Sequence, residues 1–296
     1  MNSLENLLLG CQNIAVVCHD AGAANIIIHA LLENDRKDWQ AFMQGPAKRI
    51  WHEAFPEVML VESLESCLEG ASALISGTGW ASDIEFNARK LAQETGTYSI
   101  AVIDHWINYS DRFIRDNEII LPDEFWVTDR YASNLARQTF PGENIRLIPN
   151  YYTSKQLEGI SQIKSSDDQN LLYLLEPIRA DWRMIIPGEF QALDYFISKM
   201  PLLNLPIDTK IVLRQHPSDP KNKYDEWISN HHVLDITLEA EISLSKLIAH
   251  ASWVVGCESF ALALASMAGK QCFCSLPPWA PDCRLPFKNI IKIKDL

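Results

Sequence analysis

Short runs rich in β-branched and aromatic residues alternate with amphipathic segments of about 10 to 15 residues along the whole chain. Such alternation is typical of parallel sheets whose strands are joined by crossover helices, and it predicts an α/β fold. In the first half the expected strands are 13–18, 39–43, 58–62, 72–76, 98–104, 124–129 and 145–149, with helical patterns at 22–33 and 81–94.

The segment 151–170 loses this apolar rhythm and collects Ser, Gln, Lys and Asp, a composition typical of a linker. The second half then resumes the alternation, with expected strands at 171–176, 210–215, 232–236, 252–256 and 271–275 and helices at 187–200, 222–230, 241–250 and 259–268. We therefore expect two doubly wound, Rossmann-like domains, 1–155 and 170–296, facing one another across a cleft. Ligands of such sheets bind beyond the carboxyl ends of the strands, so functional residues should follow strands directly.

The formal net charge of -12 argues against binding to the phosphates of nucleic acid. By our count from the sequence, the charge is -10 over 1–150 and only -2 over 151–296, which favours the second half for an anionic ligand. The seven cysteines form no C-x-x-C pair and lie in apolar runs, as in reduced cytoplasmic proteins. We see no signal-peptide pattern, and the apolar stretch 247–269 is interrupted by His250 and Glu258, so neither export nor a membrane span is predicted.

The first expected strand ends in His19 and Asp20, ahead of Gly22 and an amphipathic segment. A histidine or carboxylate in this loop is placed to accept a proton from an incoming nucleophile. The alternative is that Asp20 only caps the following helix. Gly22 stands alone and the G-x-G-x-x-G pattern is missing, so NAD and FAD are not expected.

Two further strand ends of the first half carry polar and aromatic residues. In the loop 76–80, Thr78 and Gly79 offer a hydroxyl and backbone N–H groups to an acceptor, although a tight turn explains them as well. Asp104, His105 and Trp106 follow the fifth strand, and an aromatic ring beside a carboxylate and an imidazole is suited to holding a sugar. The alternative for these three is an internally bonded loop with a packed Trp106.

In the second half, His216 lies at a strand end and is followed by Pro217. A proline disfavours helix at the residue before it, so His216 is expected on a rigid loop where it could donate a hydrogen bond to a phosphate. Another strand ends at Gly256, and Glu258 and Ser259 then begin an apolar helix whose N–H groups and dipole favour an anion. A strand stop at Pro217 and a helix cap at Ser259 are the structural alternatives.

Arg179, and with it Arg183, would add permanent positive charge after the first strand of this half, unless both are surface residues. The remaining cysteines and histidines lack ligand spacing for zinc, so no metal is predicted.

Taken with these motifs, the arrangement resembles the GT-B superfamily of nucleotide-sugar enzymes, with the acceptor domain first and the nucleotide domain second. The His-Pro of RQHPSDP and the Ser of GCESF resemble the two nucleotide-binding motifs of bacterial sialyltransferases and related capsule and lipopolysaccharide transferases. This resemblance implies that His216 and Pro217 contact cytidine monophosphate and that Ser259 contacts its phosphate. GCESF is also similar to the segment of UDP-N-acetylglucosamine 2-epimerases and UDP-sugar transferases in which a Glu, here Glu258, holds the ribose.

The resemblance implies a metal-independent glycosyltransferase that moves a sugar from a CMP- or UDP-sugar to a hydroxyl of a saccharide or lipid-linked acceptor, with no separate cofactor. The acidic motif that supplies the base in those families is missing, and His19 and Asp20 are a partial substitute. The alternatives are a nucleotide-sugar 2-epimerase or hydrolase on the same fold, or a non-catalytic protein that binds an anionic ligand. The basic, apolar segment 288–296 allows peripheral contact with the inner face of the membrane, although an ordinary terminal strand is favoured.

Overall fold

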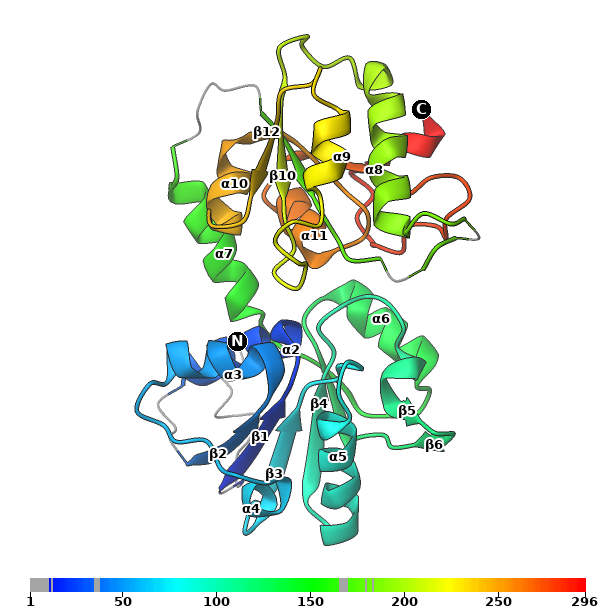
Figure 1. Cartoon of the computed structure of the whole chain (residues 1–296). Coiled ribbons are helices and arrows are strands. Elements are labelled where there is room, and N and C mark those ends of the chain that lie inside the picture. The colour runs from blue at the N-terminus through cyan, green and yellow to red at the C-terminus, as the bar shows by residue number, and fades with distance from the viewer. Residues whose placement is uncertain (1–10, 12, 35–37, 165–169, 179, 183) are drawn as a thin grey trace. The chain divides into compact units, whose positions relative to one another are not determined.

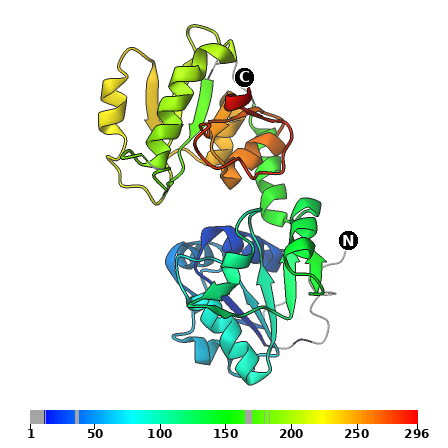
Figure 2. The same cartoon turned by 90° about the vertical axis from the view of Figure 1, so that its right-hand side faces the viewer.

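Two six-stranded parallel sheets organise the chain in the computed structural model (Figure 1). The structure describes residues 11, 13–34, 38–164, 170–178, 180–182 and 184–296. One sheet belongs to a unit formed by Met1–Ser154 and the other to a unit formed by Lys155–Leu296. Helices cover both faces of each sheet (Figures 1 and 2), which confirms the predicted α/β class and its Rossmann-like domains.

The strand order of the first sheet reverses between β1 and β3: β2 lies on one side of β1, and the later strands lie on the other. Its strands, in spatial order, are β2 (Trp39–Met43), β1 (Ile14–Cys18), β3 (Ala73–Ser76), β4 (Tyr98–Val102), β7 (Glu124–Val127) and β8 (Ile145–Leu147). Such a reversal creates the crevice in which doubly wound sheets bind ligands. The strand expected at 58–62 is wrong: Val61 donates one backbone hydrogen bond to Ala41, and no ladder forms.

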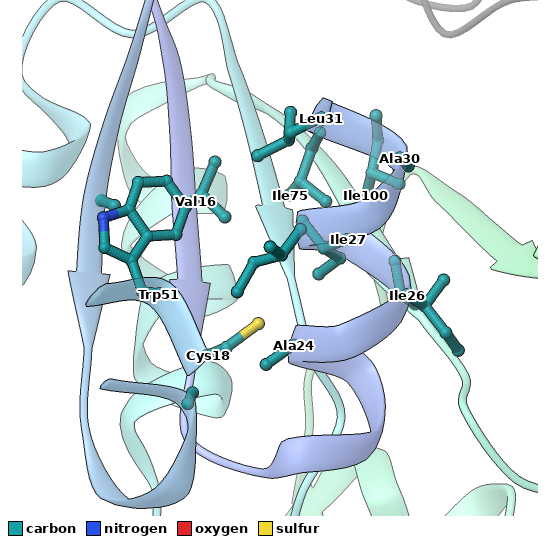
Figure 3. Packing of buried hydrophobic residues seen from close by; sticks show 14 of the residues in the cluster. Val16, Cys18, Ala24, Ile26, Ile27, Ala30, Leu31, Trp51, Ile75 and Ile100 are labelled. Carbon is teal, nitrogen blue, oxygen red and sulfur yellow. The ribbon is translucent and has the colours of Figure 1, made fainter. Parts of the chain in front are cut away.

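The core of this unit follows from β1, whose five residues are all buried. Ile14, Val16 and Cys18 pack on one face, in the cluster that includes Trp51. Figure 3 shows Val16, Cys18 and Trp51 in this cluster. Ala15 and Val17 pack on the other face. A strand covered on both faces is uniformly apolar, which is why it was readable from the sequence.

The helices of the first unit complete these two layers. The first face is covered by α2 (Ala21–Leu32) and α3 (Gly45–Ala54), and the second by α4 (Leu64–Leu68) and α5 (Ile84–Thr95). The remaining elements are η1 (Ser110–Phe113), the hairpin of β5 (Ile114–Arg115) and β6 (Glu118–Ile119), and α6 (Arg130–Thr139).

The second sheet has its reversal between β9 and β12. Its spatial order is β11 (Ile236–Glu239), β10 (Lys210–Arg214), β9 (Asn170–Leu174), β12 (Ala251–Gly256), β13 (Gln271–Cys274) and β14 (Ile290–Lys292). Strand β11 begins at the end of the predicted range 232–236, because a turn closed by the Leu234 N–H on the His231 carbonyl precedes it.

The connections of the second unit are α8 (Gly188–Lys199), η2 (Met200–Leu203), α9 (Asp225–Asn230), α10 (Leu244–His250), α11 (Phe260–Met267) and η3 (Ile293–Asp295). The apolar stretch 247–269 is thus divided among α10, β12 and α11, as predicted. In the described part of the chain, no helix is both long and apolar enough to cross a bilayer.

Most of the segment 151–170, expected to be a linker, is the helix α7 (Tyr151–Gln162), and residues 165–169 lie outside the described part of the chain. The Asn150 side chain accepts a hydrogen bond from the Thr153 N–H at 3.0 Å, which is the geometry of a helix N-cap. Thr153 and Ile160 are buried, seven residues apart on one face, while the polar residues that suggested a linker are mostly exposed.

Candidate functional site

His19 and Asp20 form a pair at the carboxyl end of β1, beside the reversal of the first sheet. The Nδ1 atom of His19 lies 2.7 Å from Oδ1 of Asp20. Asp20 occupies the N-cap position of α2, but its side chain makes no capping bond, so the capping alternative does not hold. A carboxylate on Nδ1 fixes the tautomer of the imidazole and leaves Nε2 as the proton-exchanging atom.

A buried carboxylate of α5, Glu85, holds the loops after β1 and β3. Its two oxygens accept the N–H groups of His19 at 2.9 Å and of Gly79 at 2.5 Å. Burial raises the pKa of Glu85, and these hydrogen bonds only partly oppose the shift.

The carbonyl groups of the loop after β3 accept hydrogen bonds from side chains of the protein. Three arginines donate to its successive carbonyls: Arg89 to Gly77 at 2.9 Å, Arg112 to Thr78 at 3.4 Å, and Arg115 to Gly79 at 3.0 Å.

Thr78 and Gly79, predicted to contact the acceptor, both make hydrogen bonds within the protein. Thr78 is fully buried, and its hydroxyl donates to the Val102 carbonyl and accepts from Arg112, both at 3.0 Å. The Gly79 N–H belongs to Glu85.

Asp104 lies two residues after the end of β4. It forms a largely buried ion pair, with its Oδ1 atom 2.7 Å from Nη1 of Arg112. Gly22 is required beside it, because a Cβ at that position would lie 1.7 Å from Oδ2 of Asp104. Asp104 thus lies against the start of α2, the helix that directly follows His19 and Asp20 in the sequence.

Trp106, expected to hold a sugar, is 8% exposed, and its indole N–H donates to Asp129 at 2.7 Å. It packs inside the unit beside the half-buried His105, at 5.3 Å between ring centroids. The exposed aromatic near the cluster is instead Trp80, whose ring lies 5.1 Å from the Arg112 guanidinium.

His216 stands at the carboxyl end of β10, in a loop that fixes its tautomer. The Ser218 N–H donates to Nδ1 of His216 at 3.2 Å, so the neutral ring carries its proton on Nε2. Burial lowers the pKa of His216, which keeps it neutral at physiological pH. Pro217 is exposed, and the same loop is tied down by the ion pair of Asp219 with Lys223.

Glu258 and Ser259 follow β12 at the reversal of the second sheet. An ion pair fixes the Glu258 carboxylate on Arg284, and the Ser259 hydroxyl accepts the Leu262 N–H as the cap of α11. From the end of β9, Glu176 accepts the Glu258 N–H at 3.0 Å, and burial raises the pKa of Glu176 to about 7. Gly256 is a buried residue of β12 and faces Leu174.

Arg179 and Arg183 lie outside the described residues. Within the described part, no three His, Cys, Asp or Glu side chains are grouped so that they would hold a metal ion.

Sequence reasoning missed Glu85, Arg112, Glu176 and Arg284. Glu176 carried the one usable signal, because it directly follows a predicted strand.

No protein-family model and no curated protein sequence matches the chain. Among solved structures, the chain is similar to UDP-GlcNAc 2-epimerase from Neisseria meningitidis bound to UDP-GlcNAc, with a TM-score of 0.57 and 10% identity over 85% of this chain and 79% of that one. It is also similar to the S. aureus MnaA–UDP structure, with a TM-score of 0.63 and 11% identity over 89% and 79% of the two chains. For UDP-N-acetylglucosamine 2-epimerase from Rickettsia bellii the values are 0.59 and 10%, over 89% and 78%.

Likeness at this level of identity establishes a shared fold. The shared fold is the GT-B-like, Rossmann-type arrangement of two parallel-sheet α/β domains.

Proposed function

We propose that the chain is an enzyme acting on a nucleotide-activated sugar, with the nucleotide on the second sheet and the chemistry on the first. The observation that carries this proposal is Glu258. Its carboxylate is fixed by Arg284 at the reversal of the second sheet, in the motif where the resemblance implies a ribose-holding Glu. A carboxylate oxygen bonded to Arg284 retains lone pairs for ribose hydroxyls.

The phosphates of the donor fit the neutral His216, whose Nε2–H is a hydrogen-bond donor at the end of β10, on the far side of β9 from β12. The Ser259 hydroxyl accepts in the helix cap and still has its proton to donate. A UDP-sugar is the first donor to test, because Glu258 matches the UDP-type motif and the similar structures were solved with UDP and UDP-GlcNAc.

The first candidate reaction is epimerisation or hydrolysis of the nucleotide sugar itself. It is supported by the similar epimerase structures and by the His19–Asp20 pair, which supplies a base without requiring an acceptor. Asp104 would orient the sugar from the loop after β4, which is separated from β1 by β3.

The second candidate is transfer of the sugar to a hydroxyl acceptor. One observation favours it: the His19–Asp20 pair is a single base, and Oδ1 of Asp104 is already engaged by Arg112 at 2.7 Å. Epimerisation at a carbon needs one group to remove a proton and another to return it, whereas transfer to a hydroxyl needs one base.

The two candidates are separated by incubating the protein with UDP-GlcNAc and other UDP- and CMP-sugars in D2O without acceptor. Deuterium in the sugar, seen by NMR, indicates epimerisation. Free UDP indicates hydrolysis, and turnover only after an acceptor is added indicates transfer.

His19→Ala should abolish turnover and His216→Ala should weaken UDP binding, with exposed His52→Ala and His232→Ala as controls. If no nucleotide raises the melting temperature and no sugar nucleotide is turned over, the proposed function is wrong.

A further inference from the structure

Glu85 is a buried carboxylate that bonds two loops of the first unit. It lies in the first turn of α5 and is fully buried. One oxygen accepts the His19 N–H from the loop after β1, and the other accepts the Gly79 N–H from the loop after β3. These are charge-assisted hydrogen bonds, so one carboxylate joins the two loops that flank the reversal of the sheet.

Two glycines make room for the carboxylates. A Cβ on Gly77 would lie 2.2 Å from Oε1 of Glu85. On Gly79 it would lie 2.1 Å from Oδ2 of Asp20 and 3.1 Å from Oε2 of Glu85. Neither glycine has a positive φ, so what these positions demand is space and not backbone freedom. The loop after β3 is therefore shaped around Glu85 and Asp20 together.

Burial raises the pKa of Glu85, and the charges of Asp20 and Arg89 that face it oppose one another. Arg89, fully buried, donates to the Gly77 carbonyl and attracts the Glu85 carboxylate, while Asp20 repels it. Burial lowers the pKa of Arg89 to about 10, which leaves it charged at neutral pH. Cys18, one residue before His19, is also buried against Glu85, and burial raises its pKa, so it stays a neutral thiol.

We propose that Glu85 is a positioning residue: its carboxylate fixes the backbone of His19 and thereby aims the His19–Asp20 pair at the substrate. This inference rests on the proposed function, in which that pair is the base. A glutamine of the same shape has only one oxygen, so Glu85→Gln holds one N–H group and turns its own NH2 toward the other. The His19 ring then loses its fixed position while its chemistry is unchanged.

The kinetic test compares Glu85→Gln with Glu94→Gln, an exposed glutamate of the same helix. A displacement of the base by about 1 Å costs on the order of 100-fold in rate. We expect kcat of Glu85→Gln to fall by about that factor, with KM and the UDP dissociation constant within about twofold of wild type. Glu94→Gln should match wild type.

Unchanged kcat in a folded Glu85→Gln protein would overturn the inference, provided that His19→Ala abolishes turnover. If instead the wild type shows no turnover or His19→Ala retains it, the proposed function or its base is at fault, and the kinetic arm says nothing against the Glu85 link itself.

A second measurement works on the wild type and needs no turnover. The sequence contains two Thr-Gly pairs, Thr78-Gly79 and Thr95-Gly96. Labelling with carbonyl-13C threonine and 15N glycine therefore gives two selected amide signals. The Gly79 signal should shift with pH as Glu85 titrates, at a pH above that of an ordinary glutamate, while Gly96, in the cap of α5, stays constant. A constant Gly79 signal, or the same titration in Glu85→Gln, would show that the carboxylate does not hold this loop.

Discussion

Gly22→Ala tests the closest approach between two loops of the candidate site. Gly22 lies in the first turn of α2 without a positive φ, so alanine there would stabilise the helix by about 0.5–1 kcal/mol if space allowed. However, the new methyl group would lie 1.7 Å from Oδ2 of Asp104, which must move away from Arg112. Overpacking costs about 1–3 kcal/mol, and the loosened ion pair adds to this cost. We expect a net loss of about 2 kcal/mol in the free energy of unfolding.

Thermal unfolding measures the effect, with an expected fall in Tm of about 4–8 °C for a domain of this size. Gly159→Ala in α7 is the matched control, because no atom lies within 4 Å of its added methyl group, and it should be neutral or slightly stabilising. In an Asp104→Ala background the overlap with the carboxylate is gone and only the Cβ of residue 104, at 3.2 Å, stays close, so Gly22→Ala should cost much less. Equal destabilisation in both backgrounds would refute the steric reasoning.

Glu124→Gln should destabilise the first unit at pH 7 and much less near pH 3, as measured by urea unfolding. Burial raises the pKa of Glu124, but hydrogen bonds from Arg146 and Trp126 bring this pKa below its ordinary value. That stability is present above the ordinary glutamate pKa and is lost as the pH falls through the folded value, so a pH-independent cost would contradict the ion pair. Glu176→Gln should raise Tm more at pH 8 than at pH 5. With a pKa of about 7 in the folded protein, Glu176 destabilises the fold increasingly as the pH rises from the ordinary glutamate pKa to about 7. Equal changes at both pH values would show that Glu176 ionises normally. His216→Ala should weaken UDP binding more than Ser259→Ala, whose hydroxyl already serves the cap of α11, and calorimetry giving the reverse order would exclude the phosphate role of His216.

Much of the fold could be predicted because its central strands are buried on both faces. In β1 burial leaves a continuous apolar run, in β12 it covers the last three residues, and the polar residues that follow each strand mark the carboxyl edge of the sheet. His19, Asp20 and Asp104 were therefore placed correctly at the strand ends of the first sheet. The residues 58–62 have the same local pattern but no second strand partner, so the pattern alone predicted a strand there wrongly.

The contacts within the site could not be predicted, because they join residues distant in the chain. The indole of Trp106 finds its acceptor 23 residues later, at Asp129, and becomes a packing residue. Glu85 acts on backbone N–H groups, which every residue but proline carries, so no side-chain pattern shows which of them it holds.

At the reversal of strand order in each sheet, a side-chain carboxylate accepts hydrogen bonds from backbone N–H groups of a nearby loop. Glu85 does so in the first unit, and Glu176 takes the Glu258 N–H just before α11 in the second. Backbone N–H groups at such a place ordinarily attract a phosphate. Because Glu176 already accepts the Glu258 N–H, that group is not available to a phosphate. The proposed nucleotide is therefore better held by side chains, with His216 donating to phosphate and Glu258 accepting from ribose, and the loop amides serve to keep those side chains in place.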